Sequence, residues 1–155
     1  MKRGIILVSL CVCIIGGCIG GGTHGYIKAY RFSVPKDELE KTVQQIIHQN
    51  PLIRQDSVKG YYNDDTNYVT IRIRENDLFY SYTFRYYGSK EYWETSKTSE
   101  VFIAYAHDTS GKGGSSGNGG VKWYNFKLKK ELTKPFEREL IEQIDSKLGT
   151  KHTEE

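Results

Sequence analysis

Cysteine is missing from almost the whole chain, because its three copies, Cys11, Cys13 and Cys18, all fall within the first 18 of 155 residues. A domain formed by the later residues therefore has no disulfide framework and no cysteine-based metal site. Proline occurs only three times, which excludes a proline-rich linker protein. Histidine is also scarce, and its four copies show no His-x-x-x-His spacing. We expect neither a cofactor nor a metal centre.

A strong charge of one sign is also missing. Lys and Arg number 22 against 19 Asp and Glu, which gives a formal net charge of +3 without long charge blocks. With 37% hydrophobic and 26% charged residues, the composition is that of a folded chain rather than a disordered one. Loss of the first 17 residues would remove two basic side chains and leave a formal charge of +1. This near-neutral balance argues against nucleic acid as a partner, and the length allows one domain.

The N-terminus has the charge pattern of an export signal. Lys2 and Arg3 precede an uncharged stretch, 4–22, whose centre is apolar. The stretch contains Ile15-Gly16-Gly17-Cys18, an aliphatic residue, two small residues and a cysteine. These four residues resemble the lipobox of bacterial lipoproteins. The resemblance implies that residues 1–17 are a signal peptide and that Cys18 is the lipid-attachment residue, held in a membrane by palmitate-type acyl chains.

Two alternatives remain open for this segment. The 19 uncharged residues of 4–22 are long enough for an uncleaved membrane anchor, although glycine in the second half disfavours a helix. A cleaved signal without lipid is the other, but the usual A-x-A-like site is missing. The resemblance implies a place in the bacterial cell envelope. Ile19 is not the acidic retention signal of enteric lipoproteins, which favours the outer membrane where a cell has one. The Gly-rich tether, 18–25, is short, so the domain should lie close to the bilayer.

The residues after the tether, 26–149, have the pattern of a single α+β domain. Aromatic, β-branched and alternating residues predict strands, and apolar residues spaced i, i+4, i+7 predict two helices. We expect the first helix to begin at an N-cap, Ser33, and the second near Thr133, with Gly149 as its C-terminal cap. The predicted strands are 26–32, 68–74, 78–87, 100–107 and 121–128, with 52–62 a short strand or an irregular segment. The polar tail, 150–155, is expected to fray.

These elements predict a two-layer sandwich. Consecutive strands with short connections pair antiparallel, and two amphipathic helices can cover one face of the sheet. We therefore expect an antiparallel sheet of about four to five strands with both helices packed on one face. The helix residues predicted to be buried are Leu39, Val43, Ile46, Ile47, Phe136, Leu140, Ile144 and Leu148.

Three motif-like segments do not match the chemistry that they suggest. The Gly-rich run 111–120 precedes a predicted strand, whereas a phosphate-binding loop leads into a helix, so we expect a hairpin loop. The acidic turn 63–67 alternates like calcium ligands but lacks the required glycine and glutamate, which favours a solvated turn. His107-Asp108 suggests a general base, yet neighbouring residues of a strand point to opposite faces.

The sheet face away from the helices is the candidate binding surface. Period-two alternation places arginine and aromatic residues there, which are enriched at protein interfaces. The candidate residues are Arg72, Arg74, Phe79, Arg85, Trp123 and Lys127. We therefore expect a non-catalytic envelope lipoprotein that binds another envelope protein or supports an assembly. The alternatives are a small envelope hydrolase using His107 and Asp108, or an inhibitor or immunity-type lipoprotein with a compact charged patch.

Overall fold

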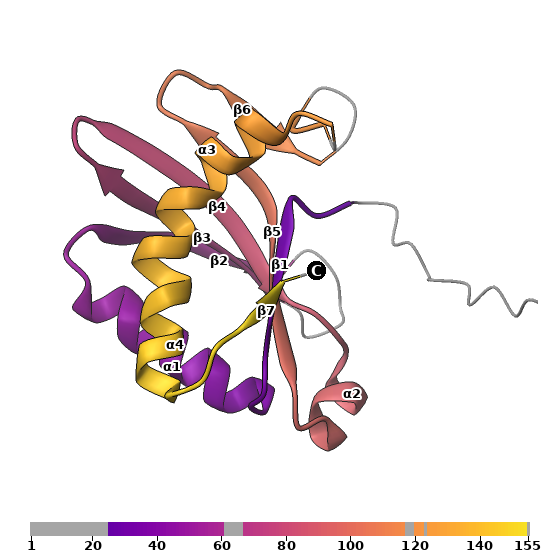
Figure 1. The fold of residues 1–155 in the computed structure, drawn as a ribbon. Helices are drawn as coiled ribbons and strands as arrows, with labels where there is room; N and C mark the ends of the chain where they lie inside the picture. The colour runs from indigo at the N-terminus through magenta and orange to yellow at the C-terminus, as the bar shows by residue number, and fades with distance from the viewer. Residues whose placement is uncertain (1–24, 61–66, 117–119, 123, 155) are drawn as a thin grey trace, which may run out of the picture.

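The computed structural model describes residues 25–60, 67–116, 120–122 and 124–154. Its seven-stranded antiparallel sheet has the order β2-β3-β4-β5-β1-β7, and β6 pairs with the remaining part of β5. The helices lie in front of this sheet in Figure 1. The strands are β1 (Lys28–Phe32), β2 (Ile53–Gly60), β3 (Asn67–Glu75), β4 (Leu78–Tyr86), β5 (Ser99–Asp108), β6 (Gly113–Ser115) and β7 (Thr153–Glu154). The expected α+β class is confirmed, and the sheet is larger than four to five strands because the short β6 and β7 extend it.

The helical layer consists of α1 (Lys36–Gln49) and a second, longer rod that crosses the same side of the sheet (Figure 1). This rod is α3 (Phe126–Phe136), one π-helical turn η1 (Glu137–Ile141) and α4 (Glu142–Leu148). A short helix, α2 (Lys90–Thr95), lies at the lower end of the sheet in Figure 1, in the connection between β4 and β5.

The core lies between these helices and the inner side of the sheet. Every second residue of the central strands is buried, including Ile71 and Ile73 of β3 and Tyr82 and Phe84 of β4. The predicted helix residues are also buried, except Leu148, which is half-buried and packs at the margin of the core. This margin is where α4 ends, at Gly149, whose left-handed conformation (φ 64°) confirms the predicted cap.

Two predicted helix starts are wrong. The first helix begins at Lys36 with Pro35 as its N-cap, so Ser33 does not cap it. The second begins at Phe126, within the segment 121–128 that was expected to be the last strand. Asn125 caps this helix by accepting a hydrogen bond from the backbone N–H of Leu128 at 3.1 Å.

The hydrogen-bonding pattern of the rod changes next to a proline. Pro135 lies inside α3, where it cannot donate a backbone hydrogen bond and where its ring crowds the preceding turn. The π-helical turn follows directly, at Glu137–Ile141, and accommodates the change in register. The rod can therefore continue and keep Phe136, Leu140 and Ile144 buried on one side.

Several sequence predictions fall outside the described residues. The lipid-attachment residue Cys18, the signal segment 1–17, Trp123 and most of the acidic turn 63–67 belong to this group. Among the residues that the structure does describe, no helix is both long and apolar enough to span a bilayer.

Candidate functional site

The sheet side that faces away from α1, α3 and α4 is called the open face below. Its residues alternate with the buried ones on β3, β4 and β5, which places them on the other side of the pleat. All of them are half-buried or exposed, and Phe79 keeps 47% of its surface accessible. The open face comprises Thr70, Arg72, Arg74, Phe79, Ser81, Thr83, Arg85, Phe102, Tyr105 and His107.

Cross-strand pairs organise one half of the open face. Arg74 stands opposite Phe79, and the hydroxyls of Thr70 and Thr83 are hydrogen-bonded at 3.1 Å. Arg72 donates two hydrogen bonds to Asp56, from Nε at 2.6 Å and from Nη2 at 2.8 Å. These bonds from Arg72 lower the pKa of the Asp56 carboxyl. The Arg72 guanidinium is thus fixed in orientation rather than free to reach a partner.

Arg85 lies at the centre of an aromatic row that crosses three strands. Its guanidinium carbon is 5.4 Å from the ring centroid of Tyr68 on β3 and 5.5 Å from that of Phe102 on β5. Tyr26 continues the row, with its ring 5.9 Å from Phe102. The Nε of Arg85 is buried without a hydrogen-bond partner among the described residues. The row therefore presents a cation held between rings, a geometry suited to recognition.

Sequence reasoning missed the contribution of β5 to this face. Tyr105 stands opposite Thr83 and is 42% exposed, and its ring makes an edge contact with His107 at 5.4 Å. A register shift in the pairing with β4, between Thr83 and Phe84, changes which β5 residues point outward. No pattern in the sequence marks this bulge, so the outward side of β5 was not assigned.

One of the six predicted face residues is not on the open face, and the position of another is not described. Lys127 is in the first turn of α3, because the segment expected to be a strand is helical there, and it cannot share a sheet face. Trp123 lies outside the described residues. The other four, Arg72, Arg74, Phe79 and Arg85, are brought together on β3 and β4. Arg74 also borders a shallow hollow at the sheet margin with Glu75 and Arg138.

The pair His107-Asp108 is not arranged as a catalytic dyad. The Nδ1 of His107 contacts the backbone carbonyl of Asp108 at 3.0 Å. The Asp108 carboxylate instead accepts bonds from the hydroxyl of Ser110 at 2.6 Å and from the backbone N–H of Lys112 at 3.0 Å. The hydrogen bond from Ser110 is the largest cause of the lowered pKa of Asp108. This carboxylate therefore closes the turn after β5.

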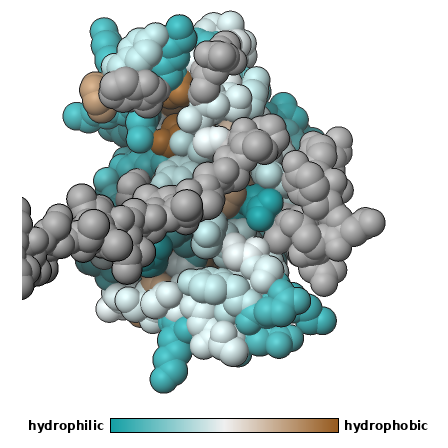
Figure 2. Space-filling view, turned by 90° about the vertical axis from the view of Figure 1, so that its right-hand side faces the viewer, coloured by the Kyte–Doolittle hydropathy of each residue, from teal (hydrophilic) through white to brown (hydrophobic). Residues whose placement is uncertain are grey.

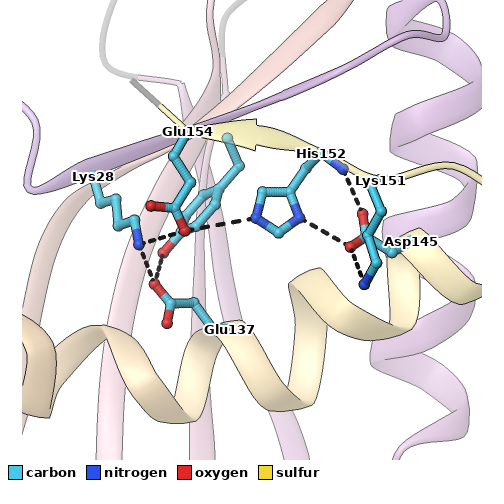
Figure 3. Close-up of polar contacts among 7 residues, drawn as sticks. Lys28, Glu137, Asp145, Lys151, His152 and Glu154 are labelled. Atoms are coloured by element: carbon cyan, nitrogen blue, oxygen red, sulfur yellow. Dashed lines mark hydrogen bonds and ion pairs between the residues drawn. The ribbon is translucent and has the colours of Figure 1, made fainter.

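A second polar cluster joins the two ends of the described chain (Figure 3). Instead of fraying, the C-terminal residues form β7, which pairs antiparallel with β1 and places Tyr30 opposite Glu154. The Nζ of Lys28 lies 2.6 Å from Glu137 and 2.8 Å from Glu154. This cluster, called the C-terminal clasp below, consists of Lys28, Tyr30, Glu137, Asp145, His152 and Glu154.

The ionisable groups of the clasp stabilise one another. Burial disfavours the charged Lys28 amine, but hydrogen bonds to Glu137 and Glu154 outweigh burial and raise its pKa. The bond from Lys28 likewise lowers the pKa of Glu154. Burial raises the pKa of the Tyr30 hydroxyl, which donates to Glu137 at 3.0 Å. These groups hold β7 against β1 and the helical rod.

Asp145 and His152 form the other half of the clasp (Figure 3). The Asp145 side chain is only 4% exposed and accepts the backbone N–H of His152 at 2.9 Å. The Nδ1 of His152 is 3.0 Å from the same carboxylate, while its Nε2 faces Glu154 at 3.8 Å. A carboxylate thus stands where a hydrolase would place the hydroxyl or thiol of a nucleophile. These contacts hold the C-terminal end of the chain in place. No residue spacing in the sequence predicts them.

Comparison with protein-family models, with curated proteins and with solved structures gave no match for this chain. Within the described part of the chain, no cluster of three or more His, Cys, Asp or Glu residues could hold a metal ion. The open face is therefore the candidate functional site on the strength of its own geometry.

Proposed function

We propose that this protein is a lipid-anchored component of the bacterial envelope that acts as a non-catalytic binding module. The resemblance of Ile15-Gly16-Gly17-Cys18 to a lipobox supports attachment through Cys18. The partner is another envelope protein, which docks on the open face. Nucleic acid is a poor match for a near-neutral exported domain.

The arrangement of the open face carries the binding proposal. Three exposed or half-buried features, Phe79, Tyr105 and the Arg85 row, lie on adjacent strands of a rigid sheet. Tyrosine and arginine are enriched among the residues that contribute most of the binding energy at protein interfaces, and aromatic side chains bury large areas. A partner that covered the row would remove its remaining water and could accept a hydrogen bond from the guanidinium of Arg85.

Anchoring is tested by Cys18→Ser in the native host. Thioether-linked diacylglycerol provides at least two acyl chains, enough for stable attachment where one chain is marginal. The variant should accumulate uncleaved or leave the membrane fraction. Processing and membrane association identical to those of the natural chain would refute the lipid attachment.

Binding is tested by trimming the exposed aromatics rather than by reversing charges. Arg72→Glu would repel Asp56, and Arg85→Glu would lose its ring contacts, so both changes would disturb the fold. We therefore choose the pair Phe79→Ala and Tyr105→Ala, with Tyr92→Ala in α2 as a control of similar exposure. Crosslinking in intact membranes followed by pull-down should recover a partner with the control and much less of it with the pair. Equal recovery would rule out the open face.

A further inference from the structure

The start of α3 exposes more aromatic surface than folding explains. Phe126, the first residue of the helix, keeps 70% of its surface accessible, and Tyr124, just before it, keeps 55%. An apolar ring in water costs free energy that burial in the core would recover. The two aromatic residues are separated in the sequence only by the capping residue Asn125, so both belong to the start of α3.

Lysine is concentrated around these rings. The segment 122–134 contains five Lys and one Glu, a net charge of +4, whereas the rest of the chain after residue 17 has a net charge of −3. The first turn of α3 contains no acidic residue, although Lys127 lies in it, close to the positive end of the helix dipole. In α1, by contrast, Asp37 and Glu38 occupy this position. The basic start of α3 therefore opposes local helix stability.

The ring of Phe126 and two of the lysines share the outer side of the helix. Phe126, Lys130 and Lys134 are spaced by four residues, which aligns them on one side, and all three are exposed. Leu132 and Phe136 lie on the other side and are buried. Figure 2 shows hydrophobic side chains among hydrophilic ones in the upper part of the molecule, at the height of α3 and β6. The exposed side of α3 thus has an aromatic residue at its start and basic residues one and two turns later.

The described chain begins at this same end of the molecule. A Cβ on Gly25 would lie 2.9 Å from the hydroxyl of Ser116, so the two residues are in contact. Ser116 pairs in turn with Val121, only three residues before Tyr124. Figure 1 likewise shows β1 and α3 both starting at the upper end, opposite α2. The seven residues 19–25 reach about 25 Å from Cys18 even when fully extended.

We propose that Lys122, Tyr124, Phe126, Lys127 and Lys130 form a second membrane contact, which docks on an anionic phospholipid bilayer. The inference rests on the lipid attachment at Cys18 proposed above, which holds this end of the domain within reach of the headgroups. The rings of Tyr124 and Phe126 enter the interface about 5–10 Å deep, and the lysine amines bind lipid phosphates. The strands of the sheet then lead away from the bilayer, so the open face stays accessible to a protein partner.

The two tryptophans of the chain provide the test. Trp123 precedes Tyr124 in the sequence, and Trp93 belongs to α2 at the opposite end (Figure 1). Trp93→Phe and Trp123→Phe each leave one tryptophan in the full chain, whose emission can be followed on its own. Both proteins are purified from host membranes and reconstituted into vesicles of phosphatidylglycerol and phosphatidylcholine that contain lipids brominated near the headgroup. If the proposed contact forms, Trp123 emission should fall to roughly half or less, because this residue is the sequence neighbour of Tyr124, while Trp93 emission stays nearly unchanged.

Variants connect this quenching with the proposed residues. Tyr124→Ser with Phe126→Ser should abolish most of the Trp123 quenching, and Lys127→Gln with Lys130→Gln should weaken it in anionic vesicles. Tyr92→Ser is the matched control and should leave it unchanged. Equal quenching of the two tryptophans, or quenching of Trp123 that survives the Tyr124 and Phe126 changes, would overturn the proposal. Flotation of the vesicles separates the two hypotheses, since a protein that fails to float has lost its anchor, whereas one that floats without quenching lacks only the second contact.

Discussion

Asp145 is expected to be the most consequential residue of the C-terminal clasp. Asp145→Ala removes the acceptor of two hydrogen bonds from His152, one from its backbone N–H and one from its ring. A hydrogen bond to a charged group contributes about 1.5–3 kcal/mol when it is fully shielded from water. The released chain end can be rehydrated, so the loss should stay near the lower limit. We expect Asp145→Ala to reduce the free energy of unfolding by about 2–3 kcal/mol.

His152→Ala should cause a loss of similar size. It removes the ring bond to Asp145 and two aromatic contacts, with Tyr30 at 5.5 Å and Phe32 at 6.0 Å between ring centroids. Lys151→Ala is the matched control, because its amine approaches the same carboxylate at 3.4 Å but its side chain is 85% exposed. Exposed ion pairs contribute about 0–1 kcal/mol, so this variant should change stability little.

A double-mutant cycle separates a cooperative clasp from two unrelated contacts. If Asp145 and His152 act together, the double variant should lose less than the sum of the two single losses, because the ring bond is counted in both, with a coupling energy of about 1–3 kcal/mol. Urea unfolding of residues 25–155, followed by circular dichroism, measures each value from the midpoint and slope. Additivity within about 0.5 kcal/mol would refute the reasoning and reduce the contact to packing without mutual support.

Three further predictions follow from the same structure. The hydrogen bond from Lys28 lowers the pKa of Glu154 below its ordinary 4.5. The contribution of ionised Glu154 to stability is therefore fully present above pH 4.5 and is lost as the pH falls through the lower pKa of the folded state. Glu154→Gln should reduce the slope of the unfolding free energy against pH in this acidic range. Leu140 is fully buried, and Leu140→Ala should reduce the unfolding free energy by about 2–5 kcal/mol in urea titrations. Gly111 and Gly113 both have positive φ, so alanine is strained at either, but only a Cβ on Gly113 would also lie 2.1 Å from a backbone oxygen of β5. Hydrogen exchange should therefore show a larger loss of the β6 pairing in Gly113→Ala than in the control Gly111→Ala, whose Cβ meets open space.

The layers of the fold could be predicted because local pattern and burial agree along most of the chain. Apolar residues spaced along 39–47 form one side of α1, and alternation along 68–86 forms the hairpin of β3 and β4 with Asn76 at its turn. In these segments, the side chains that the periodicity predicts to point inward are buried in the core. The period of an element is a local property, so it can be deduced without knowledge of distant residues.

The start of α3 shows where local pattern misleads. Alternating polar and apolar residues over 121–128 suggest a strand, but Asn125 can cap a helix and the following run, 127–132, is rich in strong helix formers. Capping and helix propensity prevail here, and the helix that results buries Leu132 and Phe136. The error placed Lys127 on the sheet, whereas the structure has it in α3.

The C-terminal clasp could not be predicted for a different reason. Lys28 and Glu137 are separated by 109 positions, so their contact depends on how the whole sheet and rod are placed. The bulge that turns Tyr105 outward depends in the same way on the pairing of β5 with β4. The larger part of the open face, on β3 and β4, could therefore be predicted from alternation, while the part on β5 required the assembled sheet.

The clasp also determines what an anchored domain can present to a partner. β1 is the first strand after residues 18–25, so a pull on the proposed anchor at Cys18 would reach the sheet through this strand. β1 is held on one side by five residue pairs with β5 and on the other by β7, which the clasp fastens to the helical rod. The rod contains α3, whose start is the proposed membrane contact. If the proposed anchor and membrane contact hold, β1, the clasp and the rod connect them to the sheet, and docking of α3 on a bilayer would orient the open face as well.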